Sequence, residues 1–334
     1  MTVLDARPIA DAGDVPLRVV VRRNPADRVY RGVARGGGVA TLTLMGFIGG
    51  FLLLRSFHVL NARGFAFLTE KRWLAAQNGP FGIAAVLPLT FEIAIVAIVI
   101  AVPVATVAAL FLTEYAPRRV RRLLTSLVDL LAAVPSLIYG LWGLFYLQPH
   151  LVHVSKWLSD HLGFIPFFHV QNGTALSAFT SSTFIAGVVV SLMVVPVCTT
   201  VMREVFAQAP QGEKEGALAL GATKWGVVRT VVLPFGRGGM IGGTMLGLGR
   251  ALGETIAVTF IISPFFQPRA SILANGTHSI SALIALNFSE SVSNPTARDG
   301  LIAAGLALFV VTLGVNAIAS TIVARSRSGA STEI

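Results

Sequence analysis

Residues 86–112 read "VLPLTFEIAIVAIVIAVPVATVAALFL", and Glu92 is the one charged side chain among them. An α-helix rises 1.5 Å per residue, so about 20 apolar residues cross the roughly 30 Å hydrocarbon core of a bilayer. The stretch is longer than a soluble core helix needs, and it lacks the polar face that such a helix shows to water. We therefore expect residues 86–112 to cross a membrane as a helix.

Five further apolar stretches of similar length lie on both sides of this one. The whole chain is 54% hydrophobic and only 13% charged, with a mean hydropathy of +0.74, which is typical of a membrane protein with several spans. The sequence therefore predicts an all-α, polytopic membrane helical bundle with six transmembrane helices. The other five spans are expected at residues 36–57, 123–147, 184–208, 238–262 and 301–324.

Three of these spans contain an internal proline: Pro103, Pro135 and Pro196. Neighbouring helices in a membrane bundle can satisfy the carbonyl groups that proline leaves unpaired. We therefore expect each proline to kink its helix and none to end it.

The basic residues predict the orientation of the chain. The net charge of +10 is carried between apolar segments, which favours a topological role over binding of nucleic acid. The segments on one side hold 18 Lys and Arg and those on the other side hold 6. By the positive-inside rule both termini are cytoplasmic. We expect a basic cytoplasmic tail at 1–35, a permease domain at 36–325, an outer loop at 148–183 and a cytoplasmic tail at 326–334.

The cytoplasmic loop 210–234, "PQGEKEGALALGATKWGVVRTVVLP", is unusually regular. Acidic residues follow Pro210 and suit the first turn of a helix, and Gly221 suits its end. We expect one short amphipathic helix over 210–220 and a second over 223–232 that ends before Pro234.

The spacing of Glu215, Ala217, Gly221, Leu233 and Pro234 in this loop resembles the EAA loop of permeases in type I importers of the ATP-binding-cassette superfamily. Gly216 departs from that pattern, where a second alanine is usual. The resemblance implies that these five residues couple the permease to a nucleotide-binding subunit. An ordinary interfacial hairpin between two spans is the alternative interpretation.

The chain contains no Gly-x-x-x-x-Gly-Lys-Ser/Thr sequence, the loop that cradles nucleotide phosphates. We therefore expect a non-catalytic subunit without a cofactor of its own. If transport is driven by ATP, then ATP and Mg²⁺ bind to a partner chain.

The sequence "GLGRALGETIAV" at 247–258 places Arg250 and Glu254 inside the fifth predicted span. Arg250 is expected about 18 Å from the cytoplasmic end of that span, near the middle of the bilayer. A charge there costs about 2.5–3.5 kcal/mol on insertion scales, so a compensating partner is expected. Glu254 follows one helical turn later on the same face, which predicts an ion pair. The pair either locks helix packing or marks the path of an anion, because guanidinium binds tetrahedral oxyanions through two hydrogen bonds.

Glycines surround this pair at the spacing that lets helices approach closely. They are Gly243, Gly247, Gly249 and Gly253. We therefore expect the fifth span to be an interface helix.

Residues 249–258 are similar to the fifth span of the phosphate-specific transport permeases, and Ala257-Val258 resembles the PstC type. The resemblance implies a bacterial cytoplasmic-membrane permease that moves inorganic phosphate inward, with Arg250 and Glu254 on the substrate pathway. It also implies a complex with a second permease of the PstA type, two ATPase subunits of the PstB type and an external phosphate-binding protein of the PstS type.

Other functions compete with this hypothesis. The cargo can instead be sulfate, molybdate or another oxyanion, or the chain can be a non-transporting membrane scaffold that recruits an ATPase. An intramembrane hydrolase is disfavoured, because Gly-x-Gly-Asp is absent from the chain. The histidines of the outer loop match no zinc-ligand spacing, so no metal site is expected.

Overall fold

The computed structural model describes residues 25–171, 173–262, 271–276 and 278–327. The chain forms two compact units, residues 1–50 and 51–334. Of the predicted tails, residues 1–24 and 328–334 lie outside the described residues. Helix α1, Pro25–Arg63, begins within the predicted cytoplasmic tail and is longer than the expected span 36–57.

The second unit consists of helices, and five helical stretches of the described chain are long and apolar enough to cross a membrane. A sixth span results if one bent pair of helices is counted as one span. The prediction of an all-helical membrane bundle is therefore confirmed, with five to six candidate spans.

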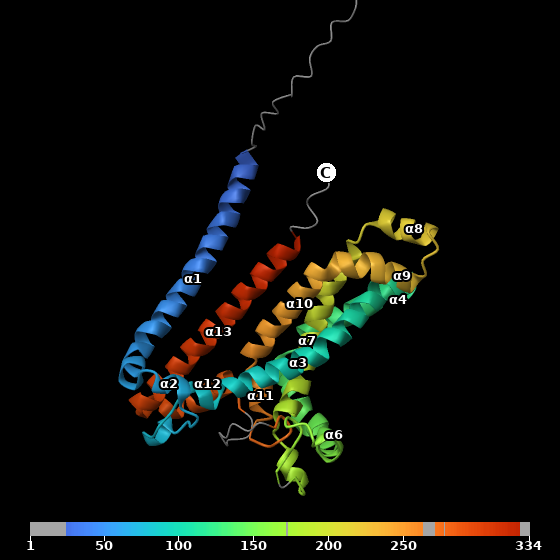
Figure 1. The fold of residues 1–334 in the computed structure, drawn as a ribbon. Coiled ribbons are helices and arrows are strands. Elements are labelled where there is room, and N and C mark those ends of the chain that lie inside the picture. Colours follow the sequence, from blue (N-terminus) through green and yellow to red (C-terminus); the bar gives the residue numbers. More distant parts are fainter. Residues whose placement is uncertain (1–24, 172, 263–270, 277, 328–334) are drawn as a thin grey trace, which may run out of the picture. The chain divides into compact units, whose positions relative to one another are not determined.

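Helices α3 (Leu87–Leu110) and α7 (Thr183–Ala207) form the centre of the bundle (Figure 1). Both helices run through their internal prolines, Pro103 and Pro196, so the prediction that neither proline ends its helix is confirmed. α3 presents a ridge of small side chains that are completely buried, which lets the two helices approach closely. The ridge consists of Ala94, Ala97, Ala101, Ala105 and Ala109.

Helix α10 (Leu233–Gly253) contacts α7, α3 and α13 (Pro295–Arg327), as Figure 1 shows. The second loop helix was expected to end before Pro234, and this prediction is wrong. α9 (Lys224–Val227) continues through the π-helix η6 (Val228–Val232) directly into α10. Pro234 stands in the first turn of α10, where the missing N–H of proline costs least.

The third predicted span, 123–147, is not one continuous helix. α4 (Arg118–Ala133) ends at Val134, and α5 (Ser136–Trp142) begins after Pro135. The chain then continues through the π-helix η4 (Gly143–Leu147) into α6 (Gln148–Leu162). The axis bends by 89° at the break, so Pro135 ends a helix where only a kink was expected. The first part of the predicted outer loop 148–183 is therefore helical.

The remaining described elements are short, and most of them lie at one end of the bundle. They include α2 (Ala66–Thr69), α11 (Ile256–Thr259) and α12 (Ile280–Asn287). A second apolar cluster joins this end to the start of α13 through Phe67, Trp73, Phe81, Ile280 and Leu301. The 3-10 helices are η1 (Ala75–Gln77), η2 (Ile83–Ala85), η5 (Leu176–Phe179) and η7 (Glu290–Ser293), and the π-helix η3 (Phe111–Tyr115) extends α3.

Candidate functional site

Two breaks in membrane helices define the candidate site. The first lies at Val134, whose backbone is extended (φ −62°, ψ 129°) between α4 and α5. The second lies at Glu254, which is also extended (φ −67°, ψ 125°) between α10 and α11. Backbone that leaves the helix within a membrane is tolerated only where protein buries it or where it lines a water-filled cavity. Both breaks therefore indicate places where helices meet or where a solute can pass.

The two broken segments pack against each other through α5 and α11. A Cβ atom added to Gly140 of α5 would lie 2.8 Å from the Cα of Ala257 in α11. Only glycine lets α5 and α11 approach this closely, because real Cβ atoms essentially never lie within 3.0 Å of a heavy atom of another helix. Gly140 thus holds the two breaks close together.

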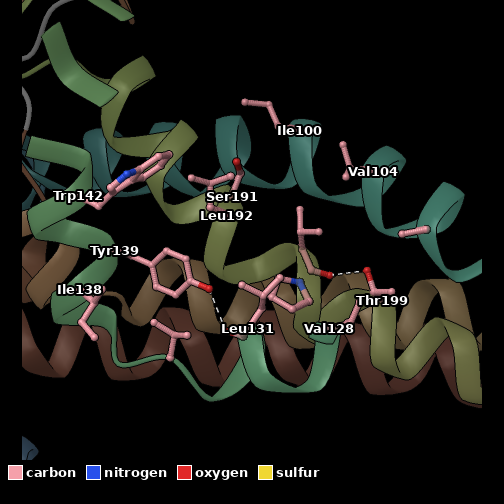
Figure 2. A pocket seen from close by; sticks show the side chains of 14 residues that line it. Ile100, Val104, Val128, Leu131, Ile138, Tyr139, Trp142, Ser191, Leu192 and Thr199 are labelled. Atoms are coloured by element: carbon pink, nitrogen blue, oxygen red, sulfur yellow. Dashed lines mark hydrogen bonds between the residues drawn. The ribbon is translucent and has the colours of Figure 1, made fainter. Parts of the chain in front are cut away.

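Arg250 lies in the last turn of α10, next to the second break. Its guanidinium has no hydrogen bond and no ion pair with any described residue, and its Nε atom is buried. The side chain lies within electrostatic reach of Tyr139 on α5. Figure 2 shows the Tyr139 hydroxyl turned toward the end of α4, where it donates a 2.9 Å hydrogen bond to the Leu131 carbonyl across the first break. A cation at a helix C-terminus is stabilised by the helix dipole, which offsets part of its desolvation.

Glu254 does not form the predicted ion pair. Arg250 and Glu254 both belong to the described residues, and the structure has no salt bridge between them. The reason is that α10 ends at Gly253, so Glu254 no longer follows Arg250 on one helical face. Its Oε1 atom instead accepts a 3.2 Å hydrogen bond from the Ala257 N–H in the first turn of α11.

The backbone of Glu254 ties this break to a further element. Its carbonyl accepts a 2.7 Å hydrogen bond from the Ser281 hydroxyl of α12, and the residue as a whole is only 8% exposed. Glu254 therefore organises the junction of α10, α11 and α12.

The four glycines of the fifth span lie in different surroundings. A Cβ atom on Gly247 would lie 2.6 Å from the Cys198 Sγ of α7, and one on Gly243 would lie 3.3 Å from Met202. Gly249 faces Asn316 of α13, whereas Gly253 has open space around it. Close packing thus concerns mainly Gly243 and Gly247, both against α7.

The loop at the opposite end of α7 and α10 contains α8, Gln211–Ala219 (Figure 1). The expected first helix is present, and Gly221 adopts the left-handed conformation (φ +85°) that favours glycine. The Gly221 N–H donates to the Leu218 carbonyl and the Ala222 N–H to the Ala217 carbonyl, which is the Schellman arrangement at a helix end. Glu215 accepts a 3.3 Å hydrogen bond from Gln211. Leu233 is half-buried and Pro234 is exposed.

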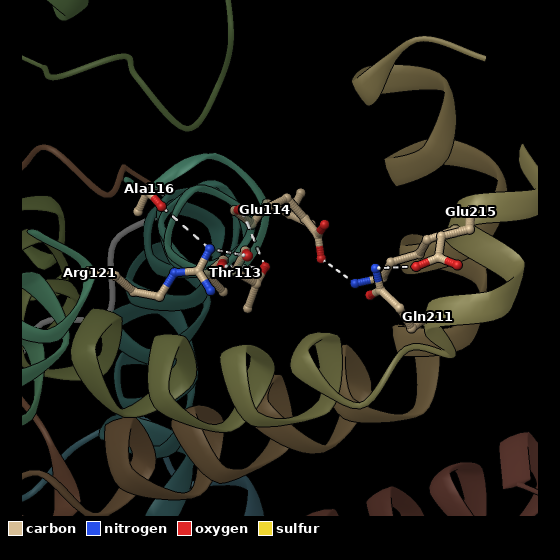
Figure 3. Close-up of polar contacts among 9 residues, drawn as sticks. Thr113, Glu114, Ala116, Arg121, Gln211 and Glu215 are labelled. Carbon is tan, nitrogen blue, oxygen red and sulfur yellow. Dashed lines mark hydrogen bonds and ion pairs between the residues drawn. The ribbon is translucent and has the colours of Figure 1, made fainter. Parts of the chain in front are cut away.

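One ion pair joins α8 to the rest of the bundle. The Lys214 Nζ lies 2.6 Å from the Glu114 Oε1 of the π-helix η3, and both side chains are largely buried, at 13% and 18% exposure. Figure 3 shows this contact beside Gln211 and Glu215. This ion pair could not be predicted from the sequence, because the two residues are far apart along the chain and their pairing depends on how α7 places α8.

The same loop exposes three large apolar side chains. Leu220 is 91% exposed, Trp225 58% and Leu218 51%. Grouped exposed apolar residues mark contact surfaces more often than isolated ones do. Their place beside Gly221 is the sequence signal that could identify them.

The histidines of the predicted outer loop are mostly helical. His150, His153 and His161 lie on α6, and His169 follows it. Among the described residues, no three His, Cys, Asp or Glu side chains gather as metal ligands would.

The chain matches the family model for the binding-protein-dependent transport system inner membrane component over residues 101–328. Several curated relatives carry the name phosphate transport system permease protein. PstC 2 of Mycobacterium tuberculosis is 42% identical over 312 residues, covering 92% of this chain and 95% of that protein. PstC of Xylella fastidiosa is 42% identical over 268 residues (80% and 81%), and PstC of Mesorhizobium japonicum is 38% identical over 310 residues (91% and 92%).

Two solved structures are also similar. A bacterial ABC transporter involved in alginate import matches with a TM-score of 0.49 and 16% identity, covering 89% of this chain and 99% of that one. The methionine transporter MetNI in an inward-facing conformation matches with a TM-score of 0.48 and 16% identity, covering 73% and 94%. The family model and the curated relatives that align over most of this chain agree on its family. The chain belongs to the inner membrane components of binding-protein-dependent transport systems, and among them to the PstC permeases of phosphate transport systems.

Proposed function

We propose that this chain passes inorganic phosphate through the membrane into the cytoplasm, and that Arg250 is the fixed positive charge on the path. One observation carries the proposal: the guanidinium of Arg250 has no carboxylate partner among the described residues, although it stands where two broken helices meet. A guanidinium with free donors can bind a tetrahedral oxyanion through two hydrogen bonds.

Glu254 belongs to the same site in this proposal. Its carboxylate holds the helix break open by accepting the Ala257 N–H, and its negative charge limits how tightly an anion is held near Arg250. Weak retention is required of a transport site, because a solute that binds too tightly is not released.

The partners follow from the same proposal. A second permease of the PstA type completes the path, and an external phosphate-binding protein of the PstS type delivers the anion. Two ATPase subunits of the PstB type bind ATP and Mg²⁺ and contact α8 through Glu215, Ala217 and Gly221. Leu220 and Trp225 then provide apolar contact area beside them. Both termini are cytoplasmic.

The test is uptake of labelled phosphate by the Arg250→Gln variant in cells without another phosphate importer. We expect at least about a tenfold loss at normal abundance of the complex, since hydrogen bonds to charged groups contribute about 1.5–3 kcal/mol. Arg250→Lys keeps the charge but not the planar fork, and it should retain an intermediate rate. Arg28→Gln makes the same change at an exposed position of α1 and serves as the control. Normal uptake by Arg250→Gln would remove this residue from the mechanism.

Two alternatives remain separable by experiment. Unlabelled sulfate or molybdate that competes with labelled phosphate as well as unlabelled phosphate does would indicate another oxyanion as cargo. A co-purified ATPase whose activity ignores phosphate, together with absent uptake, would indicate a scaffold.

A further inference from the structure

Two cavities lie end to end along the groove between α3, α4 and α7. The first has a volume of about 490 Å³ and is lined almost entirely by apolar side chains of these helices and of α5 (Figure 2). The second has a volume of about 480 Å³ and lies by the start of α4 and α8, and most of its lining side chains are charged or polar. Figure 3 labels four of the lining residues, Thr113, Glu114, Arg121 and Gln211. Both volumes fall within the usual range for ligand pockets, about 300–1,000 Å³.

One face of α4 lines both cavities. Arg118, Arg121 and Thr125 line the charged cavity, and Val128 and Leu131 line the apolar one. These positions are spaced three or four residues apart, so they share one side of the helix. None of the α4 side chains, all of which the structure describes, is buried. Helix α4 therefore forms one wall of the groove, and its side chains leave the space between the helices open.

The other two helices continue in the same way from one cavity to the next. On α3, Ala108 lines the apolar cavity, and on its π-helical extension η3, Leu112, Thr113 and Glu114 line the charged cavity about one turn later. On α7, Thr199 lines the apolar cavity and Arg203, one turn later, lines the charged cavity. Each of the three sides of the groove thus runs from the apolar cavity into the charged one.

The charged cavity carries a surplus of positive charge. It is lined by four basic side chains and two acidic ones, and one acid, Glu114, is paired with Lys214. Arg118 has no hydrogen bond or ion pair with any described residue. Arg121 donates only to the carbonyls of Thr113 (2.8 Å) and Ala116 (3.3 Å), so its charge is not neutralised. The Arg203 Nη1 is buried without a hydrogen bond, 3.7 Å from Asp129.

We propose that one anionic phospholipid binds in this groove, with an acyl chain in the apolar cavity and its phosphate group among Arg118, Arg121 and Arg203. From Arg118 to Leu131 the helix rises about 20 Å, close to the depth of one leaflet with its headgroup. Basic pockets between membrane helices on the cytoplasmic side are suited to such headgroups. The adjoining apolar cavity favours a lipid over free phosphate, which has no apolar part.

The test uses the full-length chain in its native membrane complex, extracted gently and depleted of lipid. Phosphatidylglycerol and phosphatidylcholine with the same acyl chains are added back, and bound lipid per complex is measured by native mass spectrometry. We expect retention of phosphatidylglycerol over phosphatidylcholine. Arg118→Gln should weaken that retention about fivefold, the contribution of one basic side chain near the membrane surface. Arg119→Gln removes the same charge outside the cavity and should have little effect.

A second pair of variants tests the acyl chain and does not depend on the arginines. Val104→Trp fills the apolar cavity and should reduce lipid retention, whereas Val107→Trp places the same ring on an exposed part of α3 outside the cavity. Equal binding of both lipids, equal loss in a variant and its control, or displacement of phosphatidylglycerol by inorganic phosphate would overturn the proposal. A crosslink from Val128→Cys to the second permease would also overturn it, because protein would then fill the groove. Bound lipid and crosslinked protein are both measured directly, so none of these outcomes depends on phosphate transport.

Discussion

At the scale of single residues, the contrast between Arg250 and Glu254 is the most informative. Both were expected to form an ion pair from their spacing, which holds only if the helix continues through Glu254. The helix ends at Gly253, and each residue meets a different environment. Arg250 lies at the helix end and pairs with no carboxylate of the described residues, while the carboxylate of Glu254 accepts a hydrogen bond from the backbone of α11.

This difference predicts unequal effects of two substitutions at Glu254. Glu254→Gln keeps an oxygen that can accept the Ala257 N–H, whereas Glu254→Ala removes the acceptor. The alanine variant should lose about 1 kcal/mol of stability, as at other helix caps, and the glutamine variant less. Thermal unfolding of the purified complex measures the difference. Phosphate uptake that falls equally in both variants, at normal abundance, would show that the negative charge itself is needed.

At the scale of elements, helix α8 depends on two local features. One is the left-handed Gly221, which has open space around it, so that an added methyl group meets only backbone strain. The other is the ion pair between Lys214 and Glu114, which fixes α8 to η3.

Two glycine substitutions in this loop should act in opposite directions. Gly221→Ala should cost about 1–2 kcal/mol, because φ is +85° there. Gly216→Ala lies inside α8 with nothing within 4 Å and should stabilise the helix by about 0.5–1 kcal/mol. Co-purification of the ATPase subunit with each variant measures the effect on docking. Weaker docking of Gly216→Ala would contradict the expected gain.

The ion pair can be tested by exchanging its charges. Glu114→Lys and Lys214→Glu each place two like charges in contact, and each should reduce stability and uptake. The double variant restores an opposite pair, so it should recover about 0.5–3 kcal/mol relative to the sum of the single effects. Thermal unfolding of all four proteins gives this coupling. Strictly additive losses would mean that the contact contributes nothing.

The elements also show what could be predicted from the sequence. Pro103 and Pro196 were expected to kink their helices without ending them, and neither ends its helix, because α3 and α7 are held together by a tightly buried interface. Pro135 was likewise expected to kink its helix without ending it. Proline disfavours the helical conformation of the residue before it, and the described α4 has no buried residue to outweigh that preference, so Val134 is extended. Local rules cannot distinguish these prolines, since tertiary packing decides.

At the scale of the whole molecule, five of the six predicted membrane segments could be located from the sequence because each is a long apolar run, whereas the third is broken into a bent pair of helices. The ion pair of Lys214 with Glu114 could not be predicted, nor could the electrostatic interaction of Arg250 with Tyr139, since both join residues far apart in the chain. The same holds for the groove between α3, α4 and α7. Pairwise contacts of this kind depend on helix packing, which hydropathy does not encode.

The predicted orientation can be measured with single cysteines. Phe164 is 80% exposed after α6, and Leu220 is 91% exposed beside α8. A membrane-impermeant thiol reagent should label Phe164→Cys in intact cells, but Leu220→Cys only after the membrane is opened. The native Cys198 is buried, so the unmodified protein provides the background. The reverse pattern would place the termini outside.

The tight contact of Gly247 with Cys198 and Val194 has a mechanical consequence. Two helices packed this closely move as one rigid body, so α7 and α10 cannot slide past each other by the width of a methyl group. A displacement of α8 is therefore transmitted along α7 and α10 to their opposite ends with nearly the same amplitude. Bending is then concentrated at the helix breaks at Val134 and Glu254. Spin labels on the helices that flank these two breaks should report the largest change in interhelical angle.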